Sequence, residues 1–314
     1  MTEAQEKIKV FAVCGPTASG KTSLSVTLAE VVSCDSMQIY RGMEIGTAKP
    51  TADEMQGVPH HLMGFQDPAE PFSVSDYVAL AGKVIEDIHA RGKNVLLVGG
   101  TGLYARSLLK AVPFTENSRD DEIRGNLEAE FAADGIEPLY ARLKELDPEG
   151  AEGIHPNNTR RVIRALEYCM VTGEPFSKQA KDSKAVESPY DGKMLVLSFR
   201  DRETLYGRIN LRVEQMFADG LLKEAEDYFK RYGTPGQTSV QAIGYKELFP
   251  YFEGQCSLDE AKENIKRETR RYAKRQLTWF RREEDAVWLF ADDYDAPADL
   301  ISAAEDIARA HFED

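Results

Sequence analysis

A short segment near the start of the chain has the residue types and spacing that bind phosphate. Residues 15–22, GPTASGKT, match the pattern G-x-x-x-x-G-K-[ST]. In such a loop, main-chain N–H groups surround phosphate oxygens, the lysine adds a positive charge, and the last hydroxyl can ligate Mg²⁺. We call residues 15–22 the phosphate loop and expect it to hold a diphosphate or triphosphate. The expected ligands are Gly15, Thr17, Ala18, Ser19, Gly20, Lys21 and Thr22, with Thr22 also binding Mg²⁺.

One carboxylate is placed to work beside this loop. Asp35 comes directly after the short apolar segment 31–34, and open parallel sheets bind ligands at the carboxyl ends of their strands. A nucleotide hydrolase would carry an acid after another apolar strand to hold Mg²⁺, but the strand predicted over 94–98 ends in GGT. Asp35 is therefore expected to face the phosphate loop, and the alternative is that it only caps a turn.

A basic segment runs against the acidic composition of the chain. Lys and Arg number 39 and Asp and Glu 53, so the formal net charge is −14, which taken alone argues against nucleic-acid binding. Residues 266–282 nevertheless hold eight Lys or Arg against one acid, with Tyr272, Trp279 and Phe280 between them. Cations bind phosphates and aromatic rings stack on bases. This basic stripe is a candidate RNA surface, although Tyr272 itself is expected in the core.

The elements that must hold these residues follow an α/β pattern. Apolar segments predict strands, and a helical period predicts a helix over 73–92 that stops at Gly92. Alternating strands and helices indicate a parallel sheet with right-handed crossovers, like the core of P-loop NTPases. The predicted strands are 8–14, 31–36, 94–102 and 194–199.

A mostly helical insertion domain is predicted at residues 116–192, which are charge-rich and have almost no strand signal. Residues 1–115 and 193–314 would then form the core, with a helical pattern from residue 201 onward. One connection is unusually short, because helical residues 21–30 run directly into the strand at Val31 without the usual about two to six connecting residues. Either that helix is short, or residues are missing between Glu30 and Val31.

Composition narrows the class of protein. The 314 residues are 42% hydrophobic and 29% charged, as in a soluble globular protein. No apolar run reaches the ~18 residues of a membrane span, and the polar residues 1–8 lack the apolar region of a secretory signal. The 4 cysteines show no C-x-x-C spacing, which favours a reducing compartment. We expect a cytoplasmic protein with no membrane partner.

Further motifs give the chain a family resemblance. In chain order these are GPTASGKT, DSMQIYRGMEIGTAKPT, VPHHL, GGTGLY, RRVIRALE, QAIGYKE and RYAKRQLTWFRR, and the resemblance covers residues ~8 to 282. This set resembles bacterial tRNA dimethylallyltransferases, the tRNA isopentenyltransferase family. The combination of DSMQ, GTAKPT and GGTGLY is far more specific than the phosphate loop. The chain departs from the family at the connection before Val31, where the family carries a few more residues.

The resemblance implies transfer of a dimethylallyl group from dimethylallyl diphosphate to N6 of the adenosine 3′-adjacent to the anticodon in tRNA. The phosphate loop would hold the diphosphate of the donor, with Mg²⁺ as cofactor. Because the exocyclic amine is a poor nucleophile, a base must remove its proton while the charge of the leaving diphosphate is neutralised. The expected partners are tRNA and dimethylallyl diphosphate, and a monomer is the expected state.

The resemblance also assigns roles to residues. Asp35 is the candidate base, Lys21 and Arg212 hold the diphosphate, and Thr101 contacts the target nucleotide. Arg208 lies one helical turn before Arg212 and is an alternative diphosphate ligand. The residues expected to contact tRNA are Asp35, Ser36, Met37, Gln38, Thr101, Arg124, Arg160, Arg161, Val162, Ile163, Arg164, Arg271, Lys274 and Arg275.

Other interpretations stay open at this point. Thr101 could be a helix N-cap, and the arginines of RRVIRALE could form a salt-bridged helix with Glu167. A small-molecule kinase would share the phosphate loop and an aspartate base. Prenyl transfer to a free adenine nucleotide would leave the insertion without a purpose, and a non-catalytic, nucleotide-gated RNA-binding protein would not need Asp35.

Overall fold

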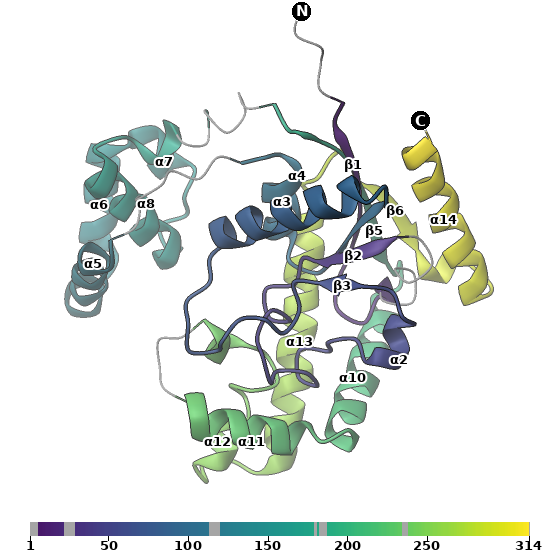
Figure 1. Cartoon of the computed structure of the whole chain (residues 1–314). Helices are drawn as coiled ribbons and strands as arrows, with labels where there is room; N and C mark the ends of the chain where they lie inside the picture. Colours follow the sequence, from purple (N-terminus) through teal and green to yellow (C-terminus); the bar gives the residue numbers. More distant parts are fainter. Residues whose placement is uncertain are drawn as a thin grey trace, which may run out of the picture. The chain divides into compact units, whose positions relative to one another are not determined.

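The computed structural model describes residues 6–21, 29–112, 120–178, 181, 187–233 and 238–313 (Figure 1). The chain forms two compact units, one built from Met1–Lys110 and Pro189–Asp314 and the other from Ala111–Ser188. The first unit holds the sheet, and the second is helical in its described part. Across the described ranges, no helix combines the length and apolar character needed to cross a bilayer.

A parallel sheet forms the centre of the first unit. Its strand order is β3-β2-β4-β1-β5-β6, and each neighbouring pair is parallel. The predicted α/β class with a parallel, P-loop-like core is thus confirmed. The strands are β1 (Ile8–Cys14), β2 (Glu30–Ser33), β3 (His60–His61), β4 (Val95–Gly99), β5 (Tyr190–Ser198) and β6 (Val287–Phe290).

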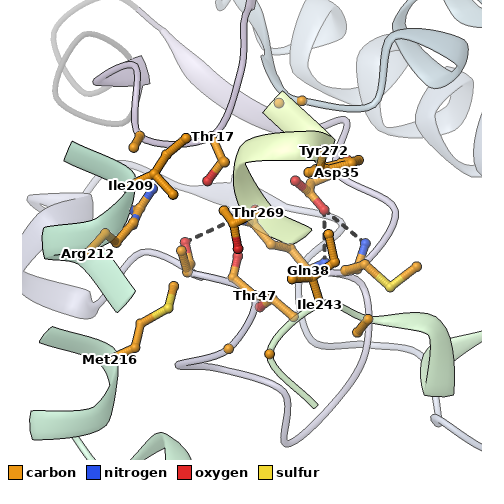
Figure 2. Close-up of a pocket in the computed structure, with 18 of the residues that line it drawn as sticks. Thr17, Asp35, Gln38, Thr47, Ile209, Arg212, Met216, Ile243, Thr269 and Tyr272 are labelled. Atoms are coloured by element: carbon orange, nitrogen blue, oxygen red, sulfur yellow. Dashed lines mark hydrogen bonds between the residues drawn. The ribbon is translucent and has the colours of Figure 1, made fainter. Parts of the chain in front are cut away.

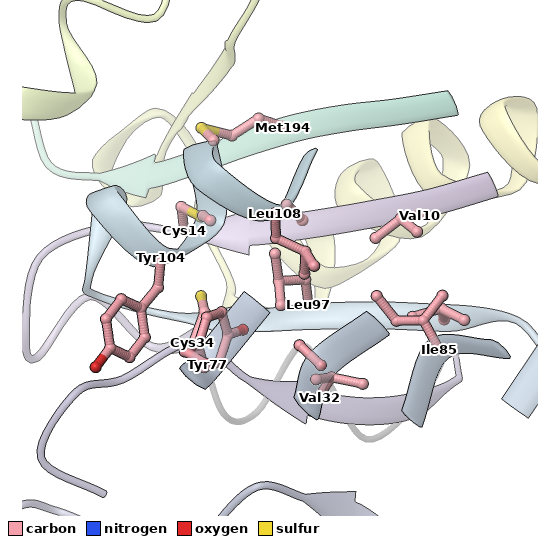
Figure 3. Close-up of a cluster of buried hydrophobic side chains, with 14 of the residues drawn as sticks. Val10, Cys14, Val32, Cys34, Tyr77, Ile85, Leu97, Tyr104, Leu108 and Met194 are labelled. Carbon is pink, nitrogen blue, oxygen red and sulfur yellow. The ribbon is translucent and has the colours of Figure 1, made fainter. Parts of the chain in front are cut away.

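Apolar side chains alternate between the two faces of the sheet. In β1, Val10, Ala12 and Cys14 enter one core cluster, and Phe11 and Val13 enter another. This period of two places apolar residues on both faces, as expected for a parallel sheet covered on both sides. Helices α3 (Val74–Ala90) and α4 (Gly102–Leu109) cover the first face (Figure 3), and α14 (Pro297–Glu313) covers the second.

Two parts of this region differ from the sequence-based expectation. The helical pattern predicted from residue 201 onward is wrong at Val287–Phe290, which form the edge strand β6 because their side chains pack on both faces beside β5. Strand β2 already begins at Glu30, so a helix after the phosphate loop must end before that residue. Residues 22–28, where this helix is predicted, lie outside the described residues.

A second core joins the segment after β2 to helices far along the chain. It contains Tyr40, Met43, Tyr228, Tyr245 and Ile265, all of them buried. Figure 1 shows α13 running from the sheet towards α11 and α12. These helices are α10 (Arg202–Ala218), α11 (Leu221–Tyr232), α12 (Phe249–Phe252) and α13 (Leu258–Phe280), and a short helix, α2 (Ala52–Met55), precedes β3.

The second unit has its own apolar core. Leu127, Leu139, Leu143 and Leu166 meet in its centre, so the unit buries apolar side chains from several of its helices. The predicted insertion domain, residues 116–192, overlaps this unit. Its described helices are α5 (Asp121–Asp134), α6 (Glu137–Leu146), α7 (Pro148–Glu152) and α8 (Thr159–Thr172).

Candidate active site

The ends of adjacent strands bring the predicted chemistry together. Cys14 at the end of β1 pairs in register with Gly99 at the end of β4, and Ser33 at the end of β2 pairs with the residue before Gly99. The phosphate loop therefore starts at Gly15 beside the turn that carries Asp35. This is the carboxyl edge of the sheet, where open α/β folds bind their ligands.

A cavity of about 680 Å³ opens at this edge. The phosphate loop, the turn after β2, residues 46–48, α10 and α13 all contribute to its wall. Arg212 reaches it from α10 and Asp35 from the turn (Figure 2). Its polar lining includes Thr17, Lys21, Asp35, Gln38, Arg208, Arg212, Thr269 and Tyr272.

The carboxylate of Asp35 uses one oxygen to hold the turn and leaves the other for the cavity. Oδ1 accepts main-chain N–H bonds from Met37 at 2.9 Å and Gln38 at 3.4 Å, whereas Oδ2 accepts none from the described part of the chain. Burial raises the pKa of Asp35, and the two N–H bonds together with Lys21 and Arg212 act against that rise. Turn cap and reactive carboxylate are therefore compatible roles.

Lys21 is held by the loop itself. Its Nζ donates to the carbonyl oxygens of Gly15 at 3.0 Å and Pro16 at 2.8 Å. Burial, and next the neighbouring Arg212, lower the pKa of Lys21 to about 8, while Asp35 acts in the opposite direction. A bound anion would reverse this destabilisation of the charged amine, so the loop is suited to a diphosphate.

The phosphate loop takes a conformation that only some residues adopt easily. Gly15 has φ +148°, and a Cβ there would lie 2.3 Å from the carbonyl oxygen of Leu197. Ala18 has φ +65° although it is not a glycine, and Arg208 Nε donates to its carbonyl oxygen at 3.0 Å. Ser19 is buried. Thr22, the expected Mg²⁺ ligand, lies outside the described residues.

The structure separates the two candidate arginines of α10. Asp201 caps the start of this helix by accepting N–H bonds from its first turn, and Arg208 and Arg212 follow one turn apart. Arg208 uses its Nε to bind the carbonyl oxygen of Ala18. Arg212 lines the cavity, burial lowers its pKa, and it forms no ion pair within the described ranges. Both arginines line the cavity, but Arg208 already holds the Ala18 carbonyl, whereas Arg212 is available to an anion without exchanging an ion pair within the described ranges.

Thr101 supports the turn rather than the helix it precedes. It occupies the N-cap position of α4, but its side chain makes no capping bond. Its Oγ1 instead accepts the N–H of Ser36 at 3.0 Å and bonds the Ser36 hydroxyl at 3.2 Å. Tyr272 is only half-buried and lines the cavity, so the expectation that it lies in the core is wrong.

One residue of the site could not be recognised from the local sequence pattern. The Oε1 of Gln276, on α13, accepts the N–H of Thr17 at 3.1 Å, and its Nε2 donates to the carbonyl oxygen of Gly100 at 2.9 Å. This buried amide ties the phosphate loop to the loop after β4. The one hint in the sequence was that Gln276 is an uncharged amide within the basic stripe.

Comparison with known proteins identifies the family to which the chain belongs. A family model described as IPP transferase matches residues 38–283. A tRNA dimethylallyltransferase from Halalkalibacterium halodurans is 48% identical over 294 residues, covering 92% of this chain and 93% of its own. The crystal structure of a full-length tRNA isopentenylpyrophosphate transferase from Bacillus halodurans aligns with TM-score 0.72 at 46% identity and covers 98% of both chains. This chain belongs to the IPP transferase family.

A solved eukaryotic relative extends the likeness. It is a dimethylallyltransferase caught in crystallographic snapshots acting on tRNA, and it aligns with TM-score 0.82 at 30% identity. The alignment covers 96% of this chain and 80% of the eukaryotic one. Membership of the IPP transferase family makes the chain a prenyltransferase.

In this IPP transferase, the Gln38 amide is already engaged. Its Nε2 donates to the carbonyl oxygens of Thr47 at 3.3 Å and Ala48 at 3.1 Å, and its Oε1 accepts from the Ser33 hydroxyl at 3.3 Å. Met37 lines the cavity beside it. Gln38 would have to exchange these partners to contact an RNA base through its amide, so its predicted tRNA contact stays a prediction.

The predicted RNA contacts on α13 lie on its exposed side. Arg271, Lys274 and Arg275 are exposed and line a second, more open groove of about 480 Å³ together with Trp279 and Arg282. Arg275 also lines the cavity that holds Asp35. The basic stripe therefore continues into the wall of the candidate active site.

In the second unit, a buried carboxylate holds two of the predicted arginines. Glu167 is fully buried, and its Oε2 lies 2.6 Å from Arg124 and 2.9 Å from Arg164. The salt-bridged interpretation thus fits Arg164. Arg160 and Arg161 are exposed and form no ion pair in the described part of the unit. Burial in the core excludes the side chains of two further predicted contacts from RNA, those of Val162 and Ile163.

A metal site made by protein groups alone is absent from the described residues. No group of three or more His, Cys, Asp or Glu side chains could hold an ion there. Mg²⁺ usually takes one or two protein oxygens together with water and substrate phosphates. The lack of a protein cage among the described residues fits an ion held mainly by donor phosphates and water beside the phosphate loop, and Thr22, the expected protein ligand, lies outside the described residues.

Proposed function

We propose that this chain transfers a dimethylallyl group from dimethylallyl diphosphate to N6 of the adenosine 3′-adjacent to the anticodon in tRNA, and releases diphosphate. One observation carries the proposal. The phosphate loop, the available oxygen of Asp35 and the available guanidinium of Arg212 face one cavity. A diphosphate site and a base within one cavity are what transfer to an amine requires.

The donor would bind with its diphosphate on the phosphate loop. Lys21 and Arg212 then lie where the negative charge of the leaving group grows, which lowers the barrier to breaking the bond between C1 of the prenyl group and oxygen. Their lowered pKa values in the free protein indicate that both cations gain from an anion. Arg208 would act indirectly, by fixing Ala18.

Asp35 would accept the proton of the acceptor. As N6 of adenine forms its bond to C1 of the dimethylallyl group, the amine loses a proton to Asp35 Oδ2 and diphosphate departs. Oδ1 stays on the main-chain N–H groups of Met37 and Gln38, so the carboxylate keeps its orientation during the transfer. Thr101 would keep Ser36, and with it the turn, in place.

Mg²⁺, when bound, would neutralise part of the diphosphate charge. Thr22 would hold it through its hydroxyl, and donor oxygens and water would complete its coordination. The support for Mg²⁺ is the phosphate-loop pattern rather than a cage of protein ligands.

The RNA would be held by local positive surface on an acidic protein. The groove formed by Arg271, Lys274 and Arg275 meets the reaction cavity at Arg275. A target adenine has to leave its stack, at a cost of a few kcal/mol, and the half-buried ring of Tyr272 offers it a stacking surface in the cavity. Arg160 and Arg161 would add phosphate contacts from the second unit.

The rival functions need fewer of these features. A kinase, or a transferase acting on free adenine nucleotide, would use the phosphate loop and Asp35 but not the basic groove.

The proposed state is a cytoplasmic monomer. The test is to incubate the protein with labelled dimethylallyl diphosphate and unmodified tRNA, AMP or ATP. Label in tRNA alone supports the proposal, whereas label in AMP or turnover of ATP without label transfer contradicts it.

A further inference from the structure

A glutamate outside the described reaction residues holds a loop of the active site. The carboxylate of Glu224, on α11, accepts three successive main-chain N–H groups, those of Glu44, Ile45 and Gly46, at 3.0 Å each. Such a run of N–H groups forms an anion-binding nest. Tyr245 donates its hydroxyl to Oε1 of the same carboxylate at 2.6 Å.

Tyr245 packs closely against the same loop that Glu224 binds. The Tyr245 ring lies against Gly46, where an added Cβ would be 2.4 Å from a ring carbon. Tyr245 is itself fully buried in the second core of the first unit. The nest therefore sits on a rigid base made by residues far away in the sequence, and we call Glu224 with Tyr245 the loop clamp.

The clamped loop reaches Asp35 through one side chain. Gly46, Thr47 and Ala48 line the cavity, and the carbonyl oxygens of Thr47 and Ala48 accept both bonds from the Gln38 amide. Gln38 in turn donates its main-chain N–H to Asp35 Oδ1. Hydrogen bonds linked by short stretches of chain thus lead from Glu224 through residues 46–48 and Gln38 to the carboxylate.

We propose that Glu224 is a positioning residue, which fixes the loop at residues 44–48 and through it the orientation of Asp35 for transfer. This inference rests on the proposed function. Hydrogen bonds between a carboxylate and N–H groups are stronger than those between neutral groups, so a neutral amide at position 224 weakens the nest. In either orientation of that amide, two of the three N–H groups would also face its NH₂ group.

The experiment compares Glu224→Gln with Glu226→Gln, a matched change on the same helix. Glu226 pairs with Lys230 at the surface, four residues along α11, and touches no part of the loop clamp. Two readouts are taken for each variant: hydrogen exchange of the amides at residues 44–46, and the pH dependence of kcat for transfer to tRNA. Tyr245→Phe removes one bond from the clamp and provides an intermediate step.

We expect Glu224→Gln to speed amide exchange at residues 44–46 at least about tenfold and to lower kcat about 10- to 100-fold. The KM for the donor should stay within about twofold, since the clamp does not touch the phosphate loop. The acid limb of kcat should move to higher pH, because a loosened turn gives Asp35 weaker N–H bonds beside Lys21, Arg212 and Tyr272. Glu226→Gln should match the wild type in every readout.

Two results would overturn the inference. Unchanged exchange at residues 44–46 would show that Glu224 does not hold the loop. Faster exchange with wild-type kcat and an unmoved acid limb would reduce Glu224 to a structural role. Failure of the wild type to modify tRNA would contradict the proposed function instead, and the exchange measurement would still test the clamp.

Discussion

Gln276 and Thr17 lie 259 positions apart in the chain and are joined by a hydrogen bond of 3.1 Å from the Thr17 N–H to the Gln276 Oε1. The same amide donates to Gly100, so α13 fixes the spacing between two loops of the site. Gln276→Ala leaves both main-chain groups without this partner, at a cost of about 1–3 kcal/mol. We expect the KM of the donor to rise about tenfold, whereas Gln255→Ala, at an exposed loop glutamine, should leave it unchanged.

Asp35→Asn should remove the base while keeping the turn. Asparagine retains an Oδ1 that accepts from Met37 and Gln38, so the donor KM should stay near the wild-type value. kcat should fall about 10²- to 10⁴-fold, the usual contribution of a general base. Steady-state kinetics with dimethylallyl diphosphate and tRNA check this. A raised donor KM with unchanged kcat would make Asp35 a binding residue.

The pH dependence of kcat should report the ionisation of the Asp35 carboxylate. Transfer needs Asp35 ionised, so kcat falls as the pH falls through its pKa. Because burial raises that pKa, the acid limb should lie above the ordinary aspartate value of about 3.9. The limb should disappear in Asp35→Asn, and its persistence there would assign it to another group.

Lys21 should set an alkaline limit for donor capture. With a pKa of about 8 in the free protein, the amine loses its charge as the pH rises through that value. We expect kcat/KM for the donor to fall above about pH 8, and kcat to change less, because bound diphosphate restores the charged form. Lys21→Arg should remove this alkaline limb, because arginine keeps its charge throughout this pH range. A flat kcat/KM profile in the wild type would show that this charge is not needed for capture.

Inhibition by the product diphosphate should separate the two arginines of α10. Arg212 has no ion pair among the described residues and faces the cavity, so Arg212→Ala should weaken diphosphate binding about 10- to 100-fold. Arg208 also lines the cavity but already holds the carbonyl oxygen of Ala18, so Arg208→Ala should weaken diphosphate binding less than about tenfold. The reverse order would assign the diphosphate to Arg208.

The proposed RNA contacts of the second unit can be tested by measuring tRNA affinity at several salt concentrations. Affinity for tRNA should fall with salt with a log–log slope of roughly −3 to −6, and removing one phosphate-binding cation should flatten it by about 0.7–0.9. Arg160→Ala with Arg161→Ala should flatten the slope by about 1–2 without unfolding the unit, because both are exposed. Arg164→Ala should instead destabilise the unit, since Glu167 is buried beside it. A slope equal to the wild-type value would remove Arg160 and Arg161 from the RNA surface.

Local pattern predicted the parts of this protein that depend on neighbours in sequence. The apolar run of residues 8–14 and the glycine spacing of the phosphate loop indicated the strand end and the anion site, and the helical period over 73–92 indicated α3. Strand β6 was missed because its four residues, Val287–Phe290, stand in a helical context and gain their strand partner only from β5.

The rest of the site depends on contacts between distant parts of the chain. Glu224 and Gln276 stand in charge-rich helices, where a solvent-facing role is the ordinary expectation. Their partners lie about 180 and 259 positions away, and no local period records them. Tyr272 was placed in the core for the same reason: its helix determines the period, but the cavity that exposes it is made by other elements.

The most direct test of the proposed transfer is to locate the added group by mass spectrometry of nucleosides and tRNA fragments. Unmodified tRNA is incubated with dimethylallyl diphosphate and either the wild-type protein or Asp35→Asn. We predict one dimethylallyl group on N6 of the adenosine 3′-adjacent to the anticodon, formed by the wild type and almost absent with the variant. A group at another position, or equal transfer by Asp35→Asn, would contradict the proposed reaction.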